Sequence, residues 1–170
     1  MAGAAIELGL QEVEALARVL NGVKLGSGDR AQLLHDIGVE MVRQTRERFD
    51  SQEDSEGNKW KDLAQKTKDY YNRHDLGGGS LLVQSGGLRD STESQVPDSW
   101  SVLSGATKVY AAIHQWGGEI RPKGAKALFV PGYGRLKKVT IPARPYLGIS
   151  GQDASDIAAI AQRFAAGRLA

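Results

Sequence analysis

The sequence contains no cysteine, which excludes disulfide bonds, thiolate nucleophiles and cysteine-ligated zinc, and it fits a reducing compartment. It also has no apolar run approaching the ~20 residues that cross a bilayer. The first residues reach Glu7 without the basic and apolar regions of a signal peptide. We therefore expect a soluble chain that is not exported and has no membrane partner.

Acidic residues are missing from a long segment, because no Asp or Glu lies between Ile120 and Gln152. The same segment is rich in basic residues: Arg121, Lys123, Lys126, Arg135, Lys137, Lys138 and Arg144. Such a segment can bind nucleic-acid phosphates with release of counterions, or an acidic patch on a neighbouring subunit. The neighbouring subunit is favoured, since no series of aromatic residues is interleaved as in proteins that bind single strands.

Signatures of catalysis are also missing. None of the 3 histidines has a second histidine three or four residues away, as a helical zinc site requires. No serine lies in a G-x-S-x-G elbow, and the glycine-rich stretches lack phosphate-binding fingerprints. His114 is the most tempting candidate base, but an imidazole hydrogen-bonded to backbone in a tight turn is the favoured interpretation. We predict no enzymatic activity, no metal and no cofactor.

The composition is that of a globular protein. The chain has 170 residues, of which 41% are hydrophobic and 25% charged. This length suits one domain, spanning residues 1–170, with a single core.

Periodic patterns predict helices near both ends. Alternation over residues 4–9 predicts a strand, and apolar spacing from Val13 to Leu20 predicts a helix after it. A second helix of about five turns is expected from a capping box at Asp29, with its flanking residues exposed. Its apolar stripe is Leu34, Ile37, Met41, Thr45 and Phe49, and its exposed flank is Arg43, Arg46, Glu47 and Arg48. A last helix is expected to be capped by Asp153 and ended by Gly167.

The middle of the chain is predicted to be loops and strands. We expect a long loop at about 50–80, one or two helical turns at 81–88, and a hairpin whose turn is Pro97-Asp98. Residues 108–113 fit a strand or a short helix. A projecting hairpin at about 125–142 should pair strands 127–130 and 138–141. The fold class is therefore α+β, a mainly antiparallel sheet packed with two or three helices.

Two prolines, at 142 and 145, stiffen the segment that follows this hairpin. A stiff ribbon lacking amide donors suits a sheet edge or a contact with another chain. Trp116, followed by two glycines, is expected to be partly exposed. The predicted subunit contacts are Trp116, Tyr133, Pro142, Arg144, Pro145 and Tyr146. The basic residues predicted to face DNA or a lumen are Lys123, Lys126, Arg135, Lys137 and Lys138.

Four segments, in order, resemble the phage virion morphogenesis family, the tail completion proteins of Mu-like phages and their relatives. They are Phe49 with Gly57-Asn58-Lys59-Trp60, Leu63 and Thr67; residues 81–91; residues 110–118; and residues 141–148. With the linking strands they cover roughly residues 45–150.

The resemblance implies a structural protein of the phage neck or tail end, built as a homohexameric ring, that completes the tail and joins it to the head. It implies assembly in the host cytoplasm, a place in the virion, and other neck, connector and tail proteins as partners. DNA in the lumen is a further candidate partner, and no catalytic residue is carried over. The alternatives are a nucleic-acid-binding protein using the basic segment 120–152 and a hydrolase with His114 as base.

Overall fold

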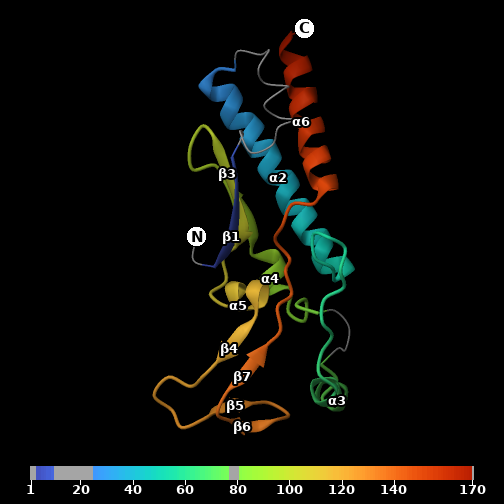
Figure 1. Cartoon of the computed structure of the whole chain (residues 1–170), viewed down its shortest axis with the longest axis vertical. Helices are drawn as coiled ribbons and strands as arrows, with labels where there is room; N and C mark the ends of the chain where they lie inside the picture. Colours follow the sequence, from blue (N-terminus) through green and yellow to red (C-terminus); the bar gives the residue numbers. More distant parts are fainter. Residues whose placement is uncertain (1–2, 10–24, 77–80, 170) are drawn as a thin grey trace.

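The computed structural model describes residues 3–9, 25–76 and 81–169 of the chain. The helix expected from Val13 to Leu20 lies outside these residues. Figure 1 shows an elongated molecule with two long helices, α2 and α6, at one end and a narrow projection of short strands at the other.

A three-stranded antiparallel sheet lies beside the long helices. It consists of β1 (Ala4–Gly9), β2 (Thr92–Gln95) and β3 (Ser101–Ala106), in the order β1-β3-β2. The turn between β2 and β3 is fixed by Asp98, whose Oδ1 accepts the amide hydrogens of Trp100 and Ser101 at 2.7 and 2.8 Å. The predicted strand at 4–9 and the predicted hairpin at Pro97-Asp98 are both confirmed.

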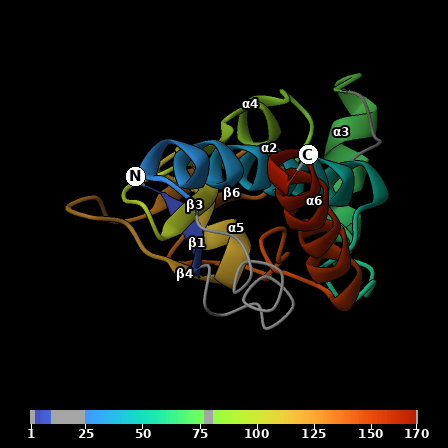
Figure 2. The ribbon, with the colours of Figure 1, turned by 90° about the horizontal axis from the view of Figure 1, so that it is seen from above.

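Helix α2 (Ser27–Ser51) packs on the inner face of this sheet, and helix α6 (Gly151–Leu169) packs against α2. Viewed along the long axis, α2 lies beside β1 and β3, and α6 lies next to α2 (Figure 2). The predicted stripe of α2 is buried as expected. It forms a core cluster with both neighbours: Leu8, Leu33, Leu34, Ile37, Met41, Val102, Ile157 and Ala161.

The helix ends differ in detail from the prediction. Gly26 is the N-cap of α2, and Asp29 lies inside the first turn, where its Oδ2 accepts the Gly26 amide at 3.3 Å. Helix α6 likewise starts before Asp153, at Gly151, because Ser150 and Asp153 exchange side-chain hydrogen bonds with each other's amides at 2.7 and 3.0 Å. Gly167 does not end α6, since it lacks the positive φ of a terminating glycine.

A second core cluster lies at the C-terminal end of α2 and is built on aromatic rings. The Phe49 ring lies 5.6 Å from that of Trp60 and 5.0 Å from that of Tyr146. Short helices α4 (Gly87–Asp90) and α5 (Ala111–Trp116) add Leu88 and Ala111 to this cluster. Of the residues 108–113, the first three therefore precede a helix and the last three form its first half.

The predicted loop at about 50–80 is partly wrong, because it contains helix α3 (Gln65–Arg73). None of the side chains of α3 is fully buried, so the helix leaves no apolar stripe in the sequence. The part before α3 is irregular as expected, with a single bridge between Glu53 and Lys59.

The projection at the other end, called the arm below, consists of residues 118–141. Strand β4 (Gly118–Ile120) pairs with β7 (Val139–Ile141), and β5 (Leu128–Val130) pairs with β6 (Gly134–Leu136). The prediction that strand 127–130 pairs with 138–141 is therefore wrong. Positive φ values at Gly132 and Gly134 let the chain reverse at once, which leaves β7 free to pair with β4. The α+β class with antiparallel sheets is confirmed.

Candidate functional site

The arm and its root expose large apolar side chains. Trp116, just before the arm, is 63% exposed, as predicted, and Phe129 on β5 is 75% exposed. Phe129 pairs across the strands with Arg135, which is also exposed. The tip of the arm therefore presents an aromatic ring beside a guanidinium.

The charges on the arm fall into two groups. Glu119 forms ion pairs with Lys138 and Arg121, each at 2.6 Å, and the hydrogen bond from Lys138 holds the Glu119 pKa below its usual range. The other predicted basic residues are exposed and have no ion pair within the described residues: Lys123, Lys126, Arg135 and Lys137. The far part of the arm is therefore an uncompensated positive surface.

The turn of the arm rests on helix α3. The hydroxyl groups of Tyr133 and Thr67 form a hydrogen bond of 2.9 Å, and the Lys66 ammonium lies 4.9 Å from the centre of the Tyr133 ring. Gly132 packs so closely on Tyr70 that a β-carbon there would lie 2.9 Å from the Tyr70 Cβ. Tyr133, predicted as a subunit contact, is thus half-buried within its own subunit.

Residues 142–150, called the strap below, connect the arm to α6. Arg144 in the strap is buried and donates from Nε to the Lys61 carbonyl at 2.8 Å, and its backbone amide donates to the His114 carbonyl at 2.8 Å. Burial lowers the Arg144 pKa. The Trp60 indole also donates to the Pro145 carbonyl, at 2.8 Å.

Tyr146 is fully buried and donates its hydroxyl hydrogen to the Ala111 carbonyl at 3.2 Å. Burial raises the pKa of Tyr146. Arg144 and Tyr146 were predicted as subunit contacts, and the structure corrects this by placing both inside the subunit, where they hold the strap. Pro142 and Pro145 are half-buried.

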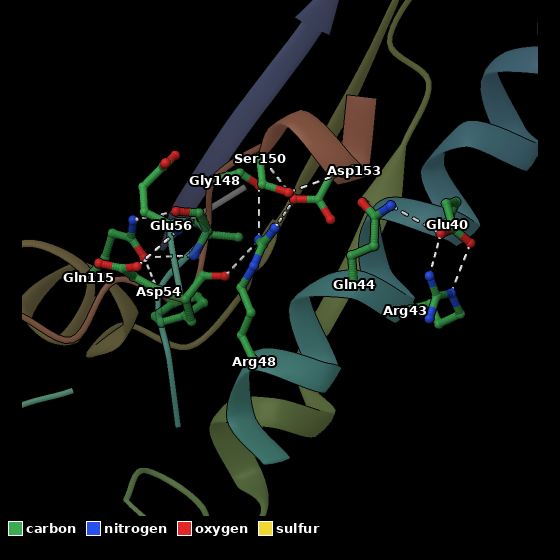
Figure 3. Close-up of polar contacts among 12 residues, drawn as sticks. Glu40, Arg43, Gln44, Arg48, Asp54, Glu56, Gln115, Gly148, Ser150 and Asp153 are labelled. Atoms are coloured by element: carbon green, nitrogen blue, oxygen red, sulfur yellow. Dashed lines mark hydrogen bonds and ion pairs between the residues drawn. The ribbon is translucent and has the colours of Figure 1, made fainter. Parts of the chain in front are cut away.

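Gln115 in α5 and Arg48 in α2 bind the strap from two sides, as Figure 3 shows for their side chains. Gln115 Oε1 accepts the amides of Tyr146 and Leu147, and its Nε2 donates to the Leu147 carbonyl, all at 3.0 Å. One buried amide side chain thus satisfies backbone groups of two consecutive residues.

Arg48 donates to the carbonyls of Tyr146 and Gly148 at 3.2 and 2.8 Å, and it forms a buried ion pair with Asp153 (Figure 3). Its predicted place on the exposed flank of the helix is wrong. Its partner lies 105 residues further along the chain, so no local pattern marks Arg48 as buried.

His114 lies half-buried in α5, where burial lowers its pKa, and its Nδ1 has no hydrogen-bond partner within the described residues. The predicted backbone hydrogen bond of its imidazole is absent from them, and its carbonyl accepts the Arg144 amide instead. Within the described residues, no group of three or more possible metal ligands is found, and no helix combines the length and apolar character of a membrane span.

Comparison with known proteins identifies the class. Residues 11–164 match the model of the phage virion morphogenesis family, and the chain belongs to this family. It is 28% identical over 154 residues to the Mu-like prophage FluMu G protein 2 of Haemophilus influenzae, covering 89% of this chain and 90% of that one. It is 27% identical over 147 residues to the putative capsid assembly protein G of Escherichia phage Mu, covering 85% of this chain and 78% of that one. No solved structure matches.

Proposed function

We propose that this protein is a structural subunit of a ring at the neck or tail end of a phage, which completes the tail and joins it to the head. The observation that carries the proposal is membership of the virion morphogenesis family over nearly the whole chain. The proposed ring is a homohexamer assembled in the host cytoplasm, and its further partners are neck, connector and tail proteins. The proposed role is structural and needs no catalytic residue.

The structure supports this proposal through the arm. A closed ring requires a heterologous interface, in which one surface of a subunit binds a different surface of the next. A projecting element that exposes Trp116 and Phe129 at 63% and 75% suits such a contact. The strap holds the root of this element on the body, so that the arm is presented in a fixed orientation.

A phage carrying a stop codon in this gene tests the proposal. Electron microscopy of the lysate should show filled heads and free tails that do not join, and supplying the protein in trans should restore infectious particles. A gold-labelled antibody should mark the neck or tail end of the restored particles. Loss of the heads themselves would contradict the proposal and favour the role named for the capsid assembly relative.

A second candidate function is nucleic-acid binding, favoured by the exposed, unpaired cations at Lys123, Lys126, Arg135 and Lys137. Such binding would weaken steeply as salt is added, since each neutralised phosphate releases counterions. A DNA probe titrated at low and at physiological salt measures this. If the DNA probe does not shift even at low salt, nucleic-acid binding is excluded as the function.

A further inference from the structure

The outer face of the three-stranded sheet is left uncovered by the described helices. Inward-facing residues such as Leu8 and Val102 form the core with α2 and α6, whereas the alternate residues of β1 and β2 are exposed. Along one rung of the sheet lie Ala5, Gly105 and Glu93, and along the next lie Glu7, Leu103 and Gln95.

This face has a definite chemical character. The middle of each rung is a glycine or a half-buried leucine, so the centre of the face is flat and apolar. Glu93 stands at one edge and Glu7 at the other, both exposed, and neither has an ion pair within the described residues. The face is therefore a shallow apolar surface bordered by two carboxylates.

The tip of the arm carries the opposite pattern. Phe129 is a projecting apolar side chain, and Arg135 stands beside it on the same face of the hairpin, with Lys137 exposed two residues further on. An aromatic ring flanked by cations complements an apolar surface flanked by carboxylates, in shape and in charge.

The two surfaces lie in different parts of the subunit. In Figure 1 the arm extends away from the sheet, toward the end of the molecule opposite α6, and its turn is held there by α3. The arm of one copy is thus presented to a second copy and not to its own sheet. A contact between two different surfaces repeats from copy to copy, as a ring requires.

We propose that the arm tip of one subunit, at Phe129 and Arg135, docks on the outer sheet face of the next subunit, between Glu7 and Glu93. The occupant of the sheet face is a second copy of this chain. The inference rests on the proposed ring and names its interface.

Because the chain has no cysteine, single introduced cysteines report this contact directly. Lys137→Cys on the arm and Ala5→Cys on the sheet both replace exposed residues outside the core. The two full-length variants are mixed at about 1 mM, where even a weak contact is populated, and treated with a short bismaleimide. We expect a cross-linked heterodimer, and a ladder of oligomers when both cysteines are placed on one chain.

Val39→Cys is the matched control for the sheet position. Val39 is 55% exposed on α2 and lies on neither proposed surface, so its mixture with Lys137→Cys should not cross-link. Equal cross-linking of the control, or of Lys137→Cys with itself, would overturn the proposal in favour of random or arm-to-arm contact.

Charge exchange tests the chemistry of the contact. Arg135→Glu should lower the cross-linked fraction on the order of tenfold, because it places like charges together. Combining it with Glu7→Arg or Glu93→Arg on the receiving copy should restore the yield. Failure of both combinations to restore it would overturn the assigned charge pairs.

The outcomes also separate this inference from the proposed function. If Lys137→Cys and Ala5→Cys do not cross-link while native mass spectrometry shows higher oligomers, the proposed interface is wrong but the proposed ring is not contradicted. If neither cross-links nor oligomers form, and phages lacking the protein still join heads to tails, both proposals are wrong. If the sheet-face cysteine cross-links only to another virion protein in assembled particles, the face binds that protein and not a second copy.

Discussion

Single side chains hold the strap to the body of the subunit. The strap forms no strand within the described residues, and its backbone groups from Pro145 to Gly148 are bound by the side chains of Gln115, Arg48 and Trp60. A buried backbone group without a partner costs roughly 1–3 kcal/mol. These side chains are therefore expected to be the most sensitive polar positions of the fold.

The ion pair between Arg48 and Asp153 gives the first prediction. Asp153→Asn keeps the size of the side chain but leaves the Arg48 guanidinium buried without a counter-charge, and should lower the free energy of unfolding by about 3–5 kcal/mol. Urea denaturation measures this loss. Arg43→Met, which breaks the exposed pairs with Glu40 and Glu47, is the control and should cost less than about 1 kcal/mol. Equal losses in the two variants would contradict the structural role of the buried pair.

Tyr146 gives a prediction for alkaline pH. Burial raises its pKa, whereas a tyrosine in the unfolded chain loses its proton near pH 10. Above about pH 10 the unfolded state therefore binds fewer protons than the folded state, and the free energy of unfolding must fall as pH rises. Below that pH the contribution is fully present.

The variant Tyr146→Phe lacks this proton linkage. It loses roughly 1 kcal/mol near pH 8 with the hydrogen bond to Ala111, and its stability should then decline less than that of the wild type between about pH 9 and 11. Chemical denaturation across this range measures both slopes. Tyr110→Phe, at a 42% exposed position, is the control and should follow the wild type. Parallel slopes for Tyr146→Phe and wild type would show that Tyr146 ionises freely in the folded state.

At the level of elements, the arm is joined to the body by few contacts. Its turn touches α3 through Tyr133 and Gly132, and its root passes Gly117, where a β-carbon would lie 2.6 Å from the Ala143 nitrogen. The strands β4 and β7 end opposite each other at Ile120 and Val139, a geometry that a two-residue turn can close.

Replacing residues 121–138 by Asn-Gly should therefore remove the arm tip and leave the body folded. We expect the free energy of unfolding to change by no more than about 1 kcal/mol, since the deletion gives up the hydrogen bond to Thr67 and the contact with Tyr70. Oligomers detected by native mass spectrometry at high protein concentration should be lost. Thr67→Val keeps the arm and loses only its hydrogen bond to α3, so this control should still form oligomers. A variant without residues 121–138 that still oligomerises would show that the arm tip is not the subunit contact.

The elements differ in how far the sequence predicts them. Helix α2 was predictable because its buried residues recur at helical spacing, from Leu34 to Phe49. Helix α3 was not, because its side chains avoid the core. The exposure of Trp116 followed from its two glycines, but the burial of Arg48 and Arg144 depends on partners that only the folded chain brings near.

For the whole molecule, we expect the free protein at about 1 μM to be monomeric. The proposed contact is built on one exposed aromatic ring, Phe129, and a few charged side chains, and such small interfaces are typical of transient complexes. Light scattering measures the mass, and association seen at higher concentration should weaken as salt screens the charges. A stable hexamer at about 1 μM would show instead that the interface is extensive and already formed in the free subunit.

The strap also has a mechanical consequence. It runs from β7 directly to the start of α6, along the long axis of the molecule (Figure 1). A pull on the arm would travel through this covalent path into α6. The hydrogen bonds from the strap to Gln115 and Arg48 would share the load with this path. The other end of the arm, β4, continues through α5 to β3, so a neighbour that grips the arm pulls on α6 through one end and on the sheet through the other.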